Sequence, residues 1–200
     1  LIGHLLGAVS GGALYRQASF LLDHVGKSVM PSWLNINERP QLLRGQGSSS
    51  FDAEGVATRD SALIEGGVLA RYVLGSYSAR KLALEATGNA GGIHNLIVDA
   101  GSADHTLDDF AGLLKRMGTG LLVTEVMGQG VSTITGDYSR GAAGFWVENG
   151  QIAYPVEGIT IAANLRDMFA GIVAVGTDVD TRSHILCGSI LLERLTVAGE

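Results

Sequence analysis

Five histidines are the side chains best suited to metal or acid–base chemistry, and their spacing decides which sites they can form. They are His4, His24, His94, His105 and His184. No two stand four residues apart with a glutamate between, so the zincin arrangement is absent. None has zinc-finger spacing, and the single cysteine, Cys187, has no cysteine neighbour. A site assembled across the fold from His94, His184 and Cys187 is an alternative, but ordinary core or surface side chains are the simpler interpretation.

Two further groups of residues give weaker signals of a catalytic or phosphate-binding site. A serine-type triad can be drawn from Ser102, Asp104 and His105, but the chain has no Gly-x-Ser-x-Gly elbow. The glycine-rich run 88–92 could suggest a phosphate cradle, yet it lacks the Lys-Ser/Thr of a P-loop, and a turn is the better interpretation. We therefore assign no catalytic residue, metal ligand or cofactor to this chain.

The segment 127–146 is the strongest candidate for a binding surface, because five glycines interleave there with Ser, Thr, Asp, Tyr and Arg. Glycine leaves backbone N–H and C=O groups open to an approaching chain, which suits addition of a peptide as a β-strand. The alternative is a twisted pair of strands that needs glycine for packing alone. The candidate peptide-groove residues are Gly128, Gly130, Thr135, Gly136, Asp137, Tyr138, Ser139, Arg140 and Gly141.

Three helices are expected to frame these residues. The first covers residues 1–22, and its small residues predict close packing against another backbone, since glycine destabilises an isolated helix. The second is capped by Thr106, with Asp109 as capping-box partner, and stops at Gly118. A short third helix begins at Asn164. The segment 30–50 is predicted to be a loop.

Hairpins and short strands account for most of the remaining chain. Gly66-Gly67 and Asn149-Gly150 each separate two strand-like runs, as two-residue hairpin turns require. The two hairpin sequences align, which fits either an internal duplication or the general likeness of hairpins. Further strands are expected at 121–126, 131–135, 143–148, 151–155, 158–162, 184–187 and 189–198. The predicted fold class is α+β, mostly antiparallel, with a sheet partly closed into a barrel.

Composition narrows the functional classes. A net charge of −6 with no basic run argues against nucleic-acid binding, and no stretch reaches the roughly 20 apolar residues of a membrane span. One cysteine suits a reducing compartment, so we expect a cytoplasmic protein. Charged residues make up only 17%, which suggests that another domain or chain covers part of the surface. The apolar start lacks the basic residues of a signal peptide and indicates a buried helix in a fragment.

The run Gly136–Gly150 resembles the PmbA (TldE) branch of the TldD/PmbA family, whose members were historically called modulators of DNA gyrase. Further similar segments occur in the family order over essentially the whole chain: 3–5, 11–12, 51–55, 76–81, 87–95 and 187–189. The family's N-terminal half is missing. The resemblance therefore identifies residues 1–200 as the C-terminal domain of a PmbA-type protein.

The resemblance implies a heterodimeric zinc metallopeptidase that acts on unfolded or short peptides, in peptide-antibiotic maturation and antitoxin turnover. In the TldD branch a His-Glu-x-x-x-His helix and a later cysteine bind zinc. Here Ile2, Gly3 and Gly7 stand at the His, Glu and His positions, and Cys187 loosely matches the later ligand. Hydrolytic zinc needs three protein ligands and a base. We expect a catalytically silent subunit, with zinc held by a TldD-type partner.

Two other functions are alternatives. The chain could be an independent hydrolase with an unrecognised site, or a regulatory or scaffold protein that modulates DNA gyrase. The expected partners are a TldD-type subunit and peptide substrates, with a homo-oligomer when the chain is alone. Neither nucleic acid nor a membrane is expected.

Overall fold

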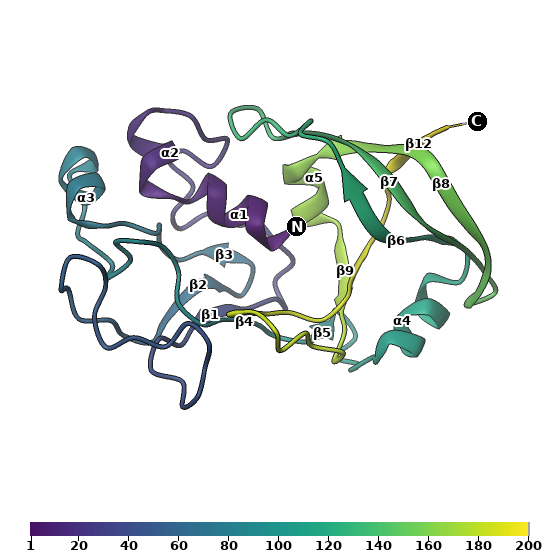
Figure 1. Cartoon of the computed structure of the whole chain (residues 1–200), viewed down its shortest axis with the longest axis horizontal. Coiled ribbons are helices and arrows are strands. Elements are labelled where there is room, and N and C mark those ends of the chain that lie inside the picture. Colours follow the sequence, from purple (N-terminus) through teal and green to yellow (C-terminus); the bar gives the residue numbers. More distant parts are fainter. Residues whose placement is uncertain (200) are drawn as a thin grey trace.

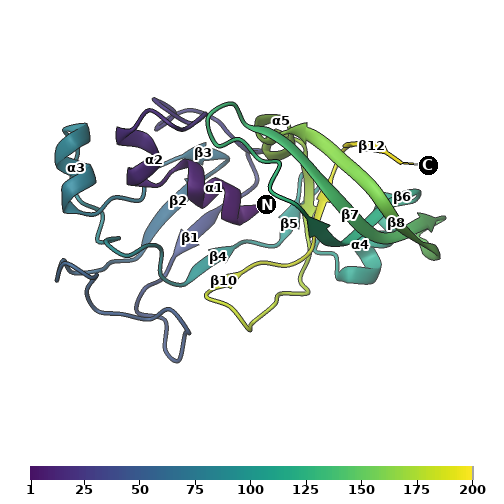
Figure 2. The ribbon, with the colours of Figure 1, turned by 45° about the horizontal axis from the view of Figure 1, so that its top comes forward.

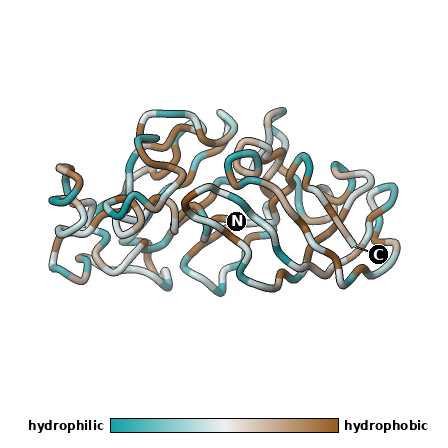
Figure 3. Tube along the Cα trace, turned by 90° about the horizontal axis from the view of Figure 1, so that it is seen from above, coloured by the Kyte–Doolittle hydropathy of each residue, from teal (hydrophilic) through white to brown (hydrophobic). Residues whose placement is uncertain are grey.

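The structure is a computed structural model and describes residues 1–199, which form three sheets and five short helices (Figure 1). Helices α1 (Ile2–Ala8), α2 (Gly11–Tyr15) and α3 (Ser76–Leu82) lie in one half of the molecule, together with the short strands between residues 36 and 98. The long strands between residues 120 and 164 and helix α4 (Phe110–Met117) lie in the other half, and α1 reaches the boundary between the halves (Figures 1 and 2). Short hydrophobic stretches are spread through both halves (Figure 3). Among residues 1–199 no helix is long and apolar enough to cross a bilayer.

The first half is built on a five-stranded sheet. Its strand order is β10 (Ile185–Leu186), β4 (Leu96–Val98), β1 (Ile36–Glu38), β2 (Ser61–Glu65) and β3 (Val68–Leu69). All pairs are antiparallel except β10 with β4. Helix α1 (Ile2–Ala8) buries Ile2, Leu5 and Ala8, one face at helical spacing, in the same core as the sheet. The segment 30–50, expected to be rich in loops, consists mostly of turns and irregular backbone and contains one short strand, β1.

The helix expected over residues 1–22 is two helices, so that prediction is wrong in its length. After α1 the chain breaks at Ser10, whose Oγ donates to the carbonyl of Gly7 and accepts from the N–H of Ala13. Ser10 thereby caps α2 (Gly11–Tyr15). The expected close packing holds at Gly11, where an added Cβ would lie 2.4 Å from Cβ of Ser78 on α3 (Ser76–Leu82).

The second half is a four-stranded antiparallel sheet. Its order is β12 (Thr196–Ala198), β8 (Gln151–Asn164), β7 (Asp137–Glu148) and β6 (Gly120–Met127). The hairpin at Asn149-Gly150 is confirmed, and φ is 52° and 74° at its two turn residues. The segments 151–155 and 158–162 belong to one strand. The strand expected at 131–135 is wrong, because residues 128–136 form a loop closed by a hydrogen bond from Gly136 N to Ser132 O, 2.8 Å.

A three-stranded sheet joins the halves, in the order β11 (Ile190–Leu192), β9 (Ile172–Val175) and β5 (Gly101–Ser102). Helix α5 (Leu165–Ala170) begins after Asn164 as predicted, and the Asn164 side chain accepts from Arg166 N at 3.0 Å. Helix α4 (Phe110–Met117) begins later than predicted. Its cap is Asp109, which accepts from Gly112 N at 2.8 Å, because the Thr106 hydroxyl is bonded to Asp104 instead.

The mostly antiparallel α+β class is confirmed, but the barrel is wrong. Strands β12 and β6 stand at opposite edges of the four-stranded sheet, and β10 and β3 at the edges of the five-stranded sheet. Over residues 1–199 no sheet closes on itself. The open edges leave strand backbone available for pairing, above all along β6.

Candidate functional site

The predicted peptide-groove residues lie in the loop 128–136 and the first part of β7. Most of their backbone is already paired inside the protein. Gly130 O accepts from Ser139 N at 2.6 Å, and β7 pairs with β8 from Asp137 onward and with β6 from Gly141 onward. A Cβ on Gly130 would lie 2.1 Å from Ser139 O, so that glycine is required for packing. The open backbone that motivated this choice is therefore absent along β7, and the groove stays a prediction.

The side chains of the predicted groove include one buried pair with α1. The ring of Tyr138, 7% exposed, meets the ring of His4 edge-on at 5.6 Å. Burial raises the pKa of Tyr138, and burial also lowers the pKa of His4, with Arg140 acting in the same direction. Both rings are therefore neutral near pH 7. They hold the start of β7 against α1 and carry no charge to a ligand.

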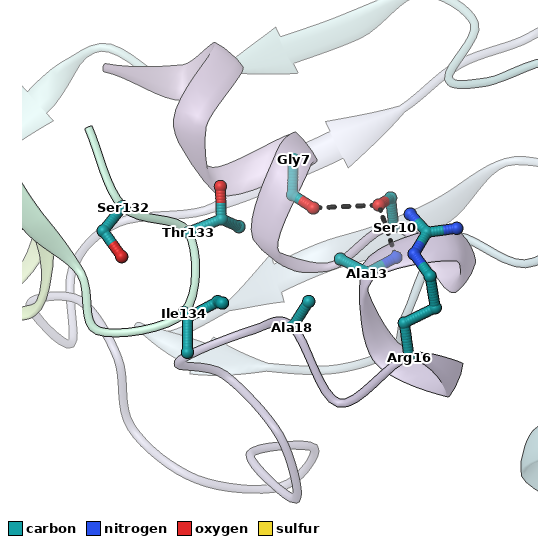
Figure 4. A pocket seen from close by; sticks show the side chains of 8 residues that line it. All are labelled: Gly7, Ser10, Ala13, Arg16, Ala18, Ser132, Thr133 and Ile134. Carbon is teal, nitrogen blue, oxygen red and sulfur yellow. Dashed lines mark hydrogen bonds between the residues drawn. The ribbon is translucent and has the colours of Figure 1, made fainter. Parts of the chain in front are cut away.

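A cleft of about 480 Å³ lies between the α1–α2 turn and the loop 128–136 (Figure 4). Its lining residues are Gly7, Ser10, Ala13, Arg16, Ala18, Ser132, Thr133 and Ile134. None of the nine predicted groove residues belongs to this lining. Three other residues of the segment 127–146 do belong to it: Ser132, Thr133 and Ile134. Phe20 N donates to Thr133 O at 2.9 Å and fixes the loop beside the helices. The cleft depends on contacts between parts of the chain that are more than 100 residues apart, so the sequence carries no local signal for it.

The positions to which the resemblance assigns the zinc ligands of the TldD branch carry no metal-binding side chain on α1. Ile2 is 5% exposed and belongs to the core, and added Cβ atoms on Gly3 and Gly7 would meet nothing within 4 Å. Cys187 is half-buried and packs against the hydrophobic core. Burial raises the pKa of the Cys187 thiol to about 11, so it is protonated at neutral pH. This donor set does not fit zinc.

The alternative metal site is also wrong. Across residues 1–199, no three His, Cys, Asp or Glu side chains gather in a group that could hold a metal ion, so His94, His184 and Cys187 do not form one. His94 instead donates to Glu38, which is 2% exposed, from its backbone N at 2.7 Å, and its Nδ1 lies 2.9 Å from the same oxygen. Asn89 Nδ2 donates to Glu38 at 2.8 Å, and Arg71 Nη2 pairs with its other oxygen. The glycine-rich run 88–92 is thus a turn that presents Asn89 to a buried network.

The serine-type triad is wrong as well. Ser102 Oγ donates to Asp104 Oδ1 at 2.6 Å, but His105 reaches Ser102 only through its backbone N–H, 3.0 Å from the carbonyl. Hydrogen bonds from Ser102, Thr106 and Arg116 hold the pKa of Asp104 far below its usual range. The cluster is a structural connection between β5 and α4, in which the serine donates to the carboxylate and the His105 side chain is not its partner.

The geometry defines an α+β domain with three mostly antiparallel sheets and a cleft between the α1–α2 turn and the loop 128–136. Residues 1–199 match the family described as the PmbA/TldA metallopeptidase C-terminal domain, and the chain belongs to this family.

Similar proteins agree with this assignment. The metalloprotease PmbA of Escherichia coli O157:H7 is 58% identical over 200 residues, which is 100% of this chain and 43% of that protein. A proposed modulator of DNA gyrase from Bacteroides thetaiotaomicron superposes with a TM-score of 0.92 at 29% identity, covering 100% of this chain and 44% of that one. TldE from Thermococcus kodakarensis has the same fold, with a TM-score of 0.80 at 24% identity over 98% of this chain and 46% of that one. The chain therefore spans less than half the length of its relatives.

Proposed function

We propose that this chain is a non-catalytic subunit of a zinc metallopeptidase that processes unfolded or short peptides, with the zinc ion held by a TldD-type partner. The observation that carries the proposal is the chemistry of α1. Ile2, Gly3 and Gly7 occupy the positions of the two histidines and the glutamate of the TldD branch, and none of them can bind a metal or take a proton from water. Membership of a metallopeptidase family then describes the complex rather than this chain.

The four-stranded sheet supports pairing with another polypeptide. Strand β6 is an edge strand whose second half is exposed, and it carries one charged residue, Glu125. Several large apolar side chains of this sheet are also exposed: Val126, Met127, Ile152, Tyr154 and Val197. A surface of this composition suits burial against a partner chain. The open β6 edge also suits an extended peptide, which β7 cannot accept because both of its sides are paired.

The test is to purify the intact protein alone and together with the TldD-type subunit and to measure cleavage of a short unstructured peptide. We expect turnover only from the complex. Cys187→Ser and His94→Ala in this chain should leave the turnover number of the assembled complex unchanged, whereas replacing the zinc-binding histidines of the partner should abolish it. Cleavage by this protein alone that is lost in Cys187→Ser would replace the proposal with an independent hydrolase.

A second function has one specific observation in its favour, the description of the Bacteroides thetaiotaomicron protein as a proposed modulator of DNA gyrase. The net charge of −6 disfavours contact with DNA but permits contact with a protein. A pull-down that uses the intact protein as bait separates the two functions. Recovery of the TldD-type subunit supports the first, and recovery of gyrase without that subunit supports the second.

A further inference from the structure

We propose that the cleft between the α1–α2 turn and the loop 128–136 binds the carboxylate of a short peptide, with Arg16 as the pairing cation. The inference rests on the proposed function in one respect, that this chain handles peptides. It adds a site on this subunit, a ligand group and the residue that recognises it.

The size and lining of the cleft suit a few residues of extended peptide. Its volume of about 480 Å³ falls within the range of about 300–1,000 Å³ usual for small-ligand sites. Ala13, Ala18 and Ile134 supply apolar surface, and the Ile134 side chain is 61% exposed although it is large and apolar. Ser132 and Thr133 add hydroxyl groups on the loop side (Figure 4). Mixed apolar and hydrogen-bonding walls match a peptide better than a purely apolar ligand.

The charge of the cleft favours an anion. Arg16 is the only charged residue in its lining, and none of the ion pairs found among residues 1–199 includes it. Its guanidinium donates one hydrogen bond, from Nη1 to Tyr15 Oη at 3.0 Å, and lies 5.2 Å from the centre of that ring. Tyr15 thus orients the guanidinium, and its other N–H groups stay available to a ligand. A planar guanidinium binds a carboxylate through two parallel hydrogen bonds, which makes a carboxylate the preferred anion.

Gly7 keeps the cleft open. Gly7 is the next-to-last residue of α1 and is exposed. Packing does not require glycine there, because an added Cβ at Gly7 would meet nothing within 4 Å. Gly7 does line the cleft, so a longer side chain at this position would enter it. Gly3 lies one turn earlier with equal space around it and outside the lining, which makes it a matched control.

The experiment is binding of a fluorescein-labelled pentapeptide to the intact protein, followed by fluorescence anisotropy. Three peptides separate the sources of the carboxylate: one with a free C-terminus, one with a C-terminal amide, and one amidated but with a central glutamate. We expect the amidated peptide without glutamate to bind about three- to tenfold more weakly than the better of the two carboxylate peptides. Whichever carboxylate peptide binds more tightly shows whether the site recognises the C-terminus or an acidic side chain.

Two pairs of variants locate the site. Gly7→Leu should weaken binding by at least about tenfold through steric exclusion, while Gly3→Leu leaves it unchanged. Arg16→Gln should weaken binding of carboxylate peptides about three- to tenfold and have little effect on the amide. Arg80→Gln makes the same charge change on the neighbouring α3, outside the lining, and should stay within about twofold. Equal affinities of Gly7→Leu and Gly3→Leu, or of the three peptides, would overturn the proposal.

Assembly separates this inference from the proposed function. Each variant is also mixed with the TldD-type subunit, and complex formation is followed by gel filtration. If the complex forms and cleaves peptide while Gly7→Leu leaves peptide affinity and KM unchanged, the cleft is not a peptide site and the proposed function stands. If the wild-type protein never forms the complex, the proposed function fails, whatever the peptide binding shows.

Discussion

Replacement of Glu38 by glutamine tests the buried network that holds the five-stranded sheet to the turn at residues 88–92. The Glu38 carboxylate accepts hydrogen bonds from Arg71, Asn89 and His94. The amide of glutamine keeps one acceptor oxygen for Asn89 and His94. Its nitrogen would face the Arg71 guanidinium, so that two donors meet and the arginine loses its counter-charge.

The magnitude follows from the burial of both partners. Removing one member of a buried ion pair costs about 3–5 kcal/mol, because the other charge stays buried without compensation. The Arg71 side chain is 15% exposed, so water can partly solvate it and lower the cost. Its Nη1 donates to Tyr72 O and Asn89 Oδ1, each at 3.1 Å, and its Nε has no hydrogen-bond partner among residues 1–199, so Glu38 supplies the negative charge but not every acceptor of this guanidinium. We expect Glu38→Gln to lower the free energy of unfolding by about 3 kcal/mol.

Urea unfolding followed by tryptophan fluorescence measures this loss, since Trp33 packs against the core. With an m-value of about 3 kcal/mol/M, the midpoint should fall by about 1 M. Glu65→Gln is the matched control, because Glu65 is an exposed residue of β2 in the same sheet, and it should change stability by less than about 0.5 kcal/mol. A change of that small size in Glu38→Gln would refute the argument that the buried charge pair stabilises this sheet.

Three further predictions use the same protein. Gly67→Ala should lower the free energy of unfolding by at least about 2 kcal/mol in urea, because φ is 75° there and the new Cβ would lie 2.2 Å from Met30 O; an unchanged midpoint would contradict this. Burial opposes ionisation of Asp52, but N–H donors led by Ala90 outweigh it and lower the pKa of Asp52. The ionised Asp52 therefore stabilises the fold above about pH 4, and this stabilisation is lost as the pH falls. In Asp52→Asn the urea midpoint should decline less between about pH 4 and pH 2 than in the wild-type protein. An equally steep decline in the variant would count against the argument. Cys187, with a pKa of about 11, should react with iodoacetamide at pH 8 far more slowly in the folded protein than in urea. The reason is that about one in a thousand of the folded thiols is ionised at this pH, against about one in four for a free thiol. Equal rates in the two states would show that the thiol is not buried.

Local signals in the sequence were sufficient where neighbouring residues decide the structure. Asn149-Gly150 can adopt the positive φ values of its turn, and Asn164 can cap the helix that follows it, so both elements were predicted correctly. The same reasoning failed where one local option competes with another. Ser10 ends the first helix early, and Asp109 rather than Thr106 caps α4, because Asp104 already engages the Thr106 hydroxyl.

Features that depend on long-range contacts could not be predicted. The sequence carries no sign that Glu38 is buried, because its partners lie 33–56 residues away along the chain. The cleft requires the loop 128–136 to fold against α1 and α2, and the hydrogen bond from Phe20 N to Thr133 O joins segments more than 100 residues apart. Conversely, the glycines of this loop suggested an open backbone, whereas Gly130 is needed so that the loop can approach Ser139. Glycine content alone does not distinguish these two roles.

Zinc titration of the chelator-treated intact protein, without its partner, tests most directly whether this chain can hold the hydrolytic metal. Isothermal calorimetry should show no saturable zinc binding in the micromolar range, because α1 offers no ligand at Ile2, Gly3 or Gly7. The TldD-type subunit, titrated under the same conditions, should bind one zinc ion. Binding of one zinc ion by this chain, lost in Cys187→Ser, would contradict the account.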